Sequence, residues 1–170
     1  MSEQKSRFWR FSLSVYADAG VQAECLDLQD RFGIDVNLLL FCAYVGAVHG
    51  ALLPQPVLQE AAGLIADWHN TIVRSLRTAR RALKQFAADR PAAAELRGGV
   101  KAAELEAERL EQLMLEAWSG PRIAGWPRAE PEAAVAANIR TLFAAGNGAA
   151  RQAGPLRQLI AAALAAAPGI

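Results

Sequence analysis

The chain has 170 residues, of which 53% are hydrophobic and 21% are charged, and this size and apolar content suit one folded domain with a buried core. Such a composition excludes intrinsic disorder as the main state. The 18 basic and 17 acidic residues leave a formal charge of +1, which excludes the broad positive field of a typical nucleic-acid-binding domain. The chain is rich in alanine, the best helix former, so we expect an all-α fold.

Compartment and membrane relation are suggested by the cysteines, the N-terminus and the most apolar segment. Cys25 and Cys42 are too few for a disulfide framework, so we expect them to be reduced core residues. Residues 1–10 carry charges where a signal peptide has an apolar run. As a helix, residues 36–48 would span roughly 20 Å, short of the ~30 Å hydrocarbon core of a bilayer. We expect a cytoplasmic protein without a membrane span.

Three short helices are predicted in the first 50 residues. The first covers residues 6–17, where apolar side chains recur at helical spacing. Asp18 and Asp35 are placed to accept hydrogen bonds from the free amides of the second and third helices, and Gly33 and Gly50 are placed to end them. The third helix is almost wholly apolar, so we expect it at the centre of the core.

A long helical hairpin is predicted over residues 57–118. Pro54 and Pro56 interrupt the chain before it, and Arg90-Pro91 separates its two helices. Each helix carries apolar residues at spacings of three and four, which predicts that the two seams pack together. The first seam comprises Ile65, Trp68, Ile72, Leu76, Ala79, Leu83 and Phe86, and the second comprises Leu96, Val100, Ala103, Ala107, Leu110, Met114 and Ala117.

The sequence of the C-terminal third predicts two alanine-rich helices with weaker apolar patterns, over residues 132–145 and 155–167. A loop at Gly146-Asn147-Gly148 separates them. No period-two strand pattern is present. The predicted architecture is therefore a cluster of short helices around a buried apolar helix, a long antiparallel hairpin, and two C-terminal helices. We expect residues 1–120 to form the main helical domain and residues 121–170 to be an extension packed on it.

Basic residues gather on one face of the first hairpin helix, and acidic residues are frequent on the second. The basic face consists of Arg74, Arg77, Arg81 and Lys84, and the acidic residues are Glu104, Glu106, Glu108, Glu111 and Glu116. The simplest interpretation is ion pairing across the hairpin together with solvated faces. The alternative is binding of RNA or another anionic partner, but no aromatic residues are interleaved for base stacking.

The sequence gives little support for a metal site or for a catalytic nucleophile. Asp67 and His69 point about 200° apart on a helix, so they cannot hold one ion together. With His49 the only other histidine, we predict no metal site, no cofactor and no catalytic residue. His69 is expected to lie on a polar surface or to bond between helices. Asn37, polar at the start of an apolar helix, either fixes that start through hydrogen bonds or reaches a ligand.

Several segments together resemble a known family. They are FWRFSL at residues 8–13, CLDLQD at 25–30 and DVNLLLFC at 35–42. The chain is similar here to a family of uncharacterised proteobacterial proteins that is catalogued as a domain of unknown function. The similarity is strongest over residues 8–50 and fades after Trp118. It implies an all-helical cytosolic protein but no activity, cofactor or substrate.

These observations leave three hypotheses for function. The first is an interaction or adaptor protein with a groove between the N-terminal helices and the hairpin, bound to an unidentified protein partner. The second is a small-ligand-binding protein or enzyme with a pocket near Asp30, Asp35, Asn37 and His69. The third is RNA or anionic-surface binding through the basic face. The candidate ligand or partner residues are Trp9, Gln29, Asp30, Asp35, Asn37 and His69.

Overall fold

The computed structural model describes residues 6–145, 154 and 156–170. The elements in chain order are α1 (Arg7–Tyr16), α2 (Ala19–Phe32), α3 (Val36–His49), α4 (Gln55–Trp68), the π-helical turn η2 (His69–Val73), α5 (Arg74–Ala87), α6 (Pro91–Ser119), the 3₁₀ turn η3 (Ile123–Gly125), α7 (Pro131–Ala145), α8 (Arg157–Ala166) and the 3₁₀ turn η5 (Ala167–Gly169). These residues contain no strand, which confirms the predicted all-α class. The predicted loop at Gly146-Asn147-Gly148 lies outside the described residues.

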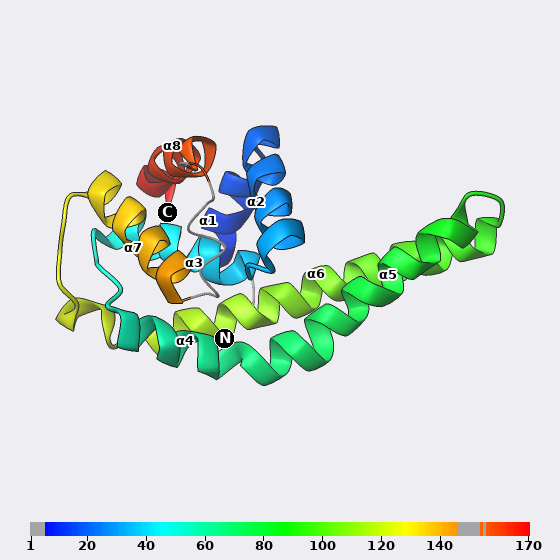
Figure 1. The fold of residues 1–170 in the computed structure, drawn as a ribbon, viewed down its shortest axis with the longest axis horizontal. Coiled ribbons are helices and arrows are strands. Elements are labelled where there is room, and N and C mark those ends of the chain that lie inside the picture. Colours follow the sequence, from blue (N-terminus) through cyan, green and yellow to red (C-terminus); the bar gives the residue numbers. More distant parts are fainter. Residues whose placement is uncertain (1–5, 146–153, 155) are drawn as a thin grey trace.

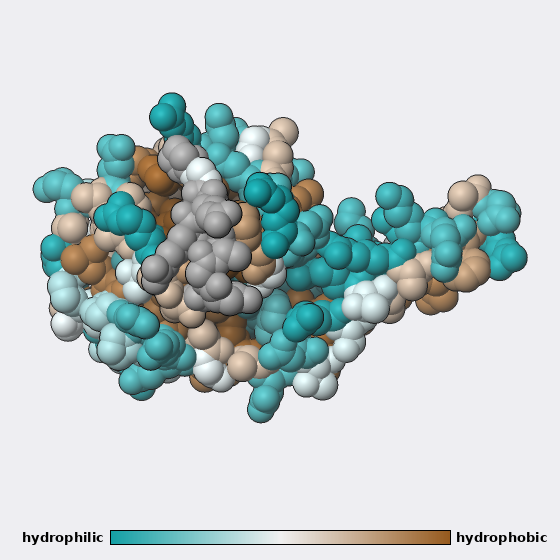
Figure 2. All heavy atoms as spheres, in the orientation of Figure 1, coloured by the Kyte–Doolittle hydropathy of each residue, from teal (hydrophilic) through white to brown (hydrophobic). Residues whose placement is uncertain are grey.

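The helices form a compact cluster with a projecting arm (Figure 1). Helices α1, α2, α3, α7 and α8 make up the cluster. The hairpin of α4, η2 and α5 against α6 runs along one side of this cluster and then extends well beyond it. In Figure 2 the visible face of this arm is largely hydrophilic, with some hydrophobic residues near its tip. In the part of the chain that the structure describes, no helix is long and apolar enough to cross a membrane.

The second and third helices begin and end where their capping residues predict. Asp18 Oδ1 accepts hydrogen bonds from the backbone N–H groups of Gly20 and Val21, at 2.7 and 3.1 Å. Helices α2 and α3 end at Gly33 and Gly50, whose φ angles of +66° and +57° lie in the left-handed region that glycine adopts without strain. Local side-chain chemistry therefore sets the boundaries of these helices.

Helix α3 is the centre of the core, as predicted. Its residues 37–47 are all buried, and α7 packs closely along it. Gly46 permits this approach, because a Cβ atom there would lie 2.5 Å from the backbone nitrogen of Val135. Asn138 of α7 ties the two helices further, since its Nδ2 donates to the carbonyl oxygens of Cys42 and Ala51. The C-terminal helix α7 is therefore firmly built into the core.

The predicted hairpin is present, but the predicted seam on its second helix is wrong. Leu96 and Leu110 are 57% and 36% exposed, and Ala103 is exposed as well. The buried face of α6 shares only Ala107 with the predicted seam and comprises Glu104, Ala107, Glu111, Gln112, Leu115 and Ser119. The physical reason has two parts. Much of the arm projects past the cluster, so α5 has no buried residue. Polar side chains of α6 are buried because they pair with residues of α5 and α3.

Candidate functional site

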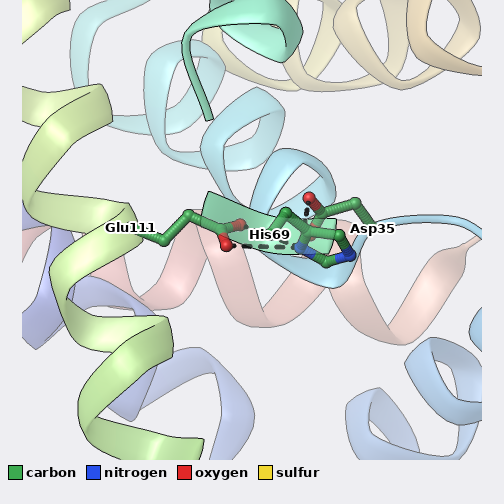
Figure 3. Close-up of side chains that lie close together, drawn as sticks. All are labelled: Asp35, His69 and Glu111. Carbon is green, nitrogen blue, oxygen red and sulfur yellow. Dashed lines mark hydrogen bonds and ion pairs between the residues drawn. The ribbon is translucent and has the colours of Figure 1, made fainter. Parts of the chain in front are cut away.

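The candidate site begins at a π-helical turn in the long hairpin. The sequence predicts an unbroken helix there, but residues His69–Val73 form a π turn in which the Arg74 N–H donates to the His69 carbonyl oxygen. Such turns are rare and occur frequently at functional sites. Figure 3 shows His69 between Asp35, from the start of α3, and Glu111, from the middle of α6.

His69 contacts both carboxylates through the same ring nitrogen. Its Nδ1 lies 3.1 Å from Asp35 Oδ2, 3.2 Å from Glu111 Oε2 and 3.3 Å from Glu111 Oε1. The Glu111 side chain is completely buried, whereas the side chains of Asp35 and His69 are 14% and 15% exposed. We call these three residues the acid–histidine cluster. It joins three segments that are far apart in the sequence.

Asn37 orients both carboxylates of this cluster. Its backbone N–H donates to Asp35 Oδ1 at 2.8 Å, and its side-chain Nδ2 donates to Glu111 Oε1 at 3.1 Å. The Gln112 Nε2 in turn donates to Asn37 Oδ1 at 2.8 Å. Asn37 thus helps to fix the start of α3 and also reaches the cluster, which combines the two roles considered from the sequence.

The surroundings of Asp35 and His69 shift the pKa values of both residues. Burial raises the pKa of Asp35 to about 7, the nearby Glu111 carboxylate adds to this rise, and His69 and the Asn37 amide oppose it. Burial lowers the pKa of His69, but its hydrogen bond to Glu111 and the charge of Asp35 outweigh that effect, so the net shift is upward. The pKa values of Asp35 and His69 therefore depend on each other, because the charge of each residue contributes to the shift of the other.

A polar cavity of about 490 Å³ opens above the cluster, between α2 and the hairpin. Its lining comprises Gln29, Asp30, Phe32, Gly33, Ile34, Asp35, His69, Asn70, Arg74, Arg77, Thr78 and Arg81. Arg81 forms an ion pair with Asp30 at 2.9 Å. Arg74 donates to Asn70 Oδ1 at 3.2 Å, and among the described residues it has no carboxylate partner. One guanidinium at the cavity is thus available to an anion.

The candidate site residues predicted from the sequence each line one of two cavities. Asp30, Asp35 and His69 line the polar cavity, and Asn37 lies directly behind it. Trp9 lines a smaller cavity of about 130 Å³, which Gln29 and Asn37 also line. Of the basic face, Arg74, Arg77 and Arg81 line the polar cavity, whereas Lys84 is exposed and does not belong to its lining.

Ion pairing accounts for part of the basic face. Arg77 bonds to Glu104 at 3.0 Å and to Glu108 at 2.6 Å, and Arg80 also bonds to Glu104. The predicted pairing of opposite charges across the hairpin is thus present here. These contacts fix α5 against α6 and so hold the wall of the polar cavity.

Sequence reasoning missed Glu111 and Gln112 as parts of the site. It grouped Glu111 with the other glutamates of α6. One signal was available, because Ala107, Glu111 and Leu115 are spaced by four and share one helix face, which is buried. The π turn gives no comparable signal in the sequence.

Comparison with known proteins gives one family match. A family described as "Protein of unknown function (DUF2390)" matches residues 7–115, a range that includes the whole acid–histidine cluster. No curated protein and no solved structure matches the chain. The match covers more than half of the 170 residues and agrees in extent with the resemblance noted from the sequence. The chain therefore belongs to the DUF2390 family of proteins of unknown function.

Proposed function

We propose that this protein binds a small polar molecule in the cavity above the acid–histidine cluster. The observation that carries this proposal is the convergence of three groups: Asp35 and His69 lie at the wall of one polar cavity, and the buried Glu111 contacts His69 from behind. Titratable groups with perturbed pKa values in a concave site are typical of binding and catalytic sites. The π turn at His69 supports the same interpretation.

The lining of the cavity favours a ligand with an anionic group. Arg74 offers a guanidinium without a carboxylate partner in the described structure, and the side chains of Asn70 and Thr78 lie beside it on the same wall. Guanidinium groups match carboxylates and phosphates in shape and charge. The volume of about 490 Å³ lies within the usual range for small-molecule sites. We therefore propose a small carboxylate or phosphate ester as the ligand.

The acid–histidine cluster would meet the other end of this ligand. His69, with a carboxylate on each side, can hold or release a proton at Nδ1. Histidine is the side chain most often used in general acid–base catalysis, so we propose that the site binds its ligand with or without proton transfer.

A thermal-shift screen tests the proposal. The probes are small carboxylates and phosphate esters, each titrated over a wide concentration range. A true ligand gives saturable stabilisation, about 2.7 kcal/mol at a hundred times its Kd. Arg74→Gln is expected to weaken the effect, whereas Lys84→Gln, a matched change on the same helix but outside the cavity lining, is not. Absence of saturable stabilisation across both compound classes would exclude the proposal.

A second candidate is the adaptor function, which one specific surface favours. An open apolar groove of about 390 Å³ lies where α4 meets α6, and it is lined by Trp68, Leu110, Leu113, Met114 and Ala117. A partner helix with an apolar face would suit such a groove. If a protein partner uses it, Leu110→Glu removes co-purification and Leu96→Glu, which changes a more exposed leucine of the same helix outside the groove, preserves it. Loss with both or neither contradicts the assignment to this groove.

RNA binding through the basic face has less support, because Arg77 and Arg81 already contact carboxylates.

We also propose that the protein is located in the cytoplasm. The support for this location is that Cys25 and Cys42 are free and buried.

A further inference from the structure

We infer that Asp35, His69 and Glu111 form a binding site for one divalent transition-metal ion. This role does not depend on a ligand in the cavity. Sequence reasoning considered only Asp67 as a partner for His69 on the same helix. The fold instead brings one donor each from α3, η2 and α6 to a common point, with one ligand atom of each residue within 4.8 Å of the others.

The distances from the His69 nitrogen to the two carboxylate oxygens match those between neighbouring ligands of a metal ion, and all three donor atoms lie within 4.8 Å of one another. Two ligands about 2.1 Å from an ion and about 90° to 109° apart are separated by about 3.0 to 3.4 Å. The His69 Nδ1 lies 3.1 Å from Asp35 Oδ2 and 3.2 Å from Glu111 Oε2. An ion could therefore be accepted with only small side-chain movements.

The neighbouring groups hold the carboxylates in the orientation that a metal requires. Asn37 contacts Asp35 Oδ1 through its backbone N–H and Glu111 Oε1 through its side chain, so Asp35 Oδ2 and Glu111 Oε2 are both left facing His69. Gln112 fixes Asn37 in turn. Such supporting hydrogen bonds are a regular feature of metal sites.

The charge balance of the cluster also favours a dication. Two carboxylates face a single ring nitrogen, which can donate only one hydrogen to the two of them. In the cavity lining, Arg77 already contacts Glu104 and Glu108, and Arg81 contacts Asp30. A divalent ion would balance both carboxylates and would bind a neutral His69 through Nδ1.

The donor set and the cavity define the class of ion. One imidazole and two carboxylates suit Zn²⁺, Mn²⁺ or Co²⁺, whereas Ca²⁺ takes six to eight oxygen ligands. Because Asp35 and His69 line the polar cavity, water or a cavity ligand can occupy the remaining coordination positions. A site with three protein ligands and an open position is of the kind that catalytic zinc sites use.

Metal titration of the chelator-treated full chain tests the inference. Zn²⁺, Mn²⁺ and Co²⁺ are added separately while heat of binding and thermal unfolding are followed. We expect at least one of these ions to bind with a stoichiometry of one and to raise the Tm. If none of the three binds at up to millimolar concentration, the inference is wrong.

Variants locate the ion. Asp35→Asn, His69→Gln and Glu111→Gln are each expected to weaken binding by at least the tenfold to hundredfold typical of lost supporting contacts. Asp27→Asn, an exposed carboxylate of α2 outside the cavity lining, and His49→Gln, the only other histidine, are the matched controls and should bind within about twofold of the wild type. Equal binding by all five variants would place the ion elsewhere and overturn the assignment.

A measurement on the wild-type protein covers the case in which a cluster variant fails to fold. The chain has only two histidines, so the ring nitrogens of His49 and His69 can be distinguished by nitrogen-15 NMR. Zn²⁺ should shift the Nδ1 signal of His69 and leave His49 unchanged, and the reverse or no shift would contradict the site. Anion binding without metal binding would refute only this inference, and metal binding without any anion ligand would refute only the proposed function.

Discussion

Replacing Asn37 by alanine tests whether the acid–histidine cluster is built as the structure shows. The buried amide bonds to Glu111 Oε1 and to Gln112 Nε2, and alanine removes both interactions. A hydrogen bond to a charged group contributes about 1.5–3 kcal/mol and a neutral one about 0.5–1.5 kcal/mol, so the free energy of unfolding should fall by about 2–4.5 kcal/mol. Asn37→Asp should lower it further, because a new carboxylate would face Glu111.

Urea denaturation followed by circular dichroism measures this loss, with chelator present to exclude metal effects. Asn70→Ala is the matched control, since Asn70 is exposed and bonds only to exposed Arg74 among the contacts described, and it should cost less than about 0.5 kcal/mol. A double-mutant cycle of Asn37→Ala with Glu111→Gln should give a coupling of about 0.5–3 kcal/mol. A loss below about 1 kcal/mol for Asn37→Ala, or a coupling near zero, would refute the described network.

Three further changes test the core and the hairpin. Leu40→Ala in α3 should lower the free energy of unfolding by about 2–5 kcal/mol in urea melts, and a change below about 1 kcal/mol would show that α3 is not central. Gly46→Ala should cost about 1–3 kcal/mol despite better helix propensity, because the new methyl group meets the Val135 backbone, and a gain in stability would contradict the close helix contact. Glu104 has a lowered pKa because, although burial raises it, hydrogen bonds from Arg80 and Arg77 outweigh burial. Its stabilising effect is therefore present above the pKa of an unfolded glutamate and is lost as pH falls through the lower folded value. The wild-type advantage over Glu104→Gln should shrink in melts taken from pH 5 to pH 3, and an advantage that does not change with pH would refute the ion pairs.

The parts of the fold that depend on local chemistry could be predicted from the sequence. Asp18, Asp35, Gly33 and Gly50 mark helix ends because capping involves atoms only a few residues apart. The burial of α3 follows from its almost continuous apolar sequence. Asp35, Asn37 and His69 could be selected as site candidates because polar groups beside an apolar core need partners.

The parts that depend on how helices are rotated against each other could not be predicted. The apolar residues of α6 predict one packing seam, but the face of the helix that is buried is offset from that seam. The reason is that Glu104 and Glu111 contact cations and polar groups of other helices. Those partners are supplied by distant segments. The π turn at His69 inserts a change of helical phase that no local residue pattern marks, and it helps bring the ring to Glu111.

The buried polar face of α6 bears on whether the cluster serves stability or function. Taking a carboxylate out of water costs several kcal/mol, and apolar residues of similar volume often hold helices together equally well or better. Helix α6 follows that simpler solution at Leu115, which is fully buried against the same core, one turn beyond Glu111. At Glu111 it buries a carboxylate instead, opposite a second carboxylate and a histidine at the edge of a polar cavity. Packing requirements alone do not explain why a carboxylate is buried at this position, whereas binding of a proton, a metal ion or a polar ligand explains it.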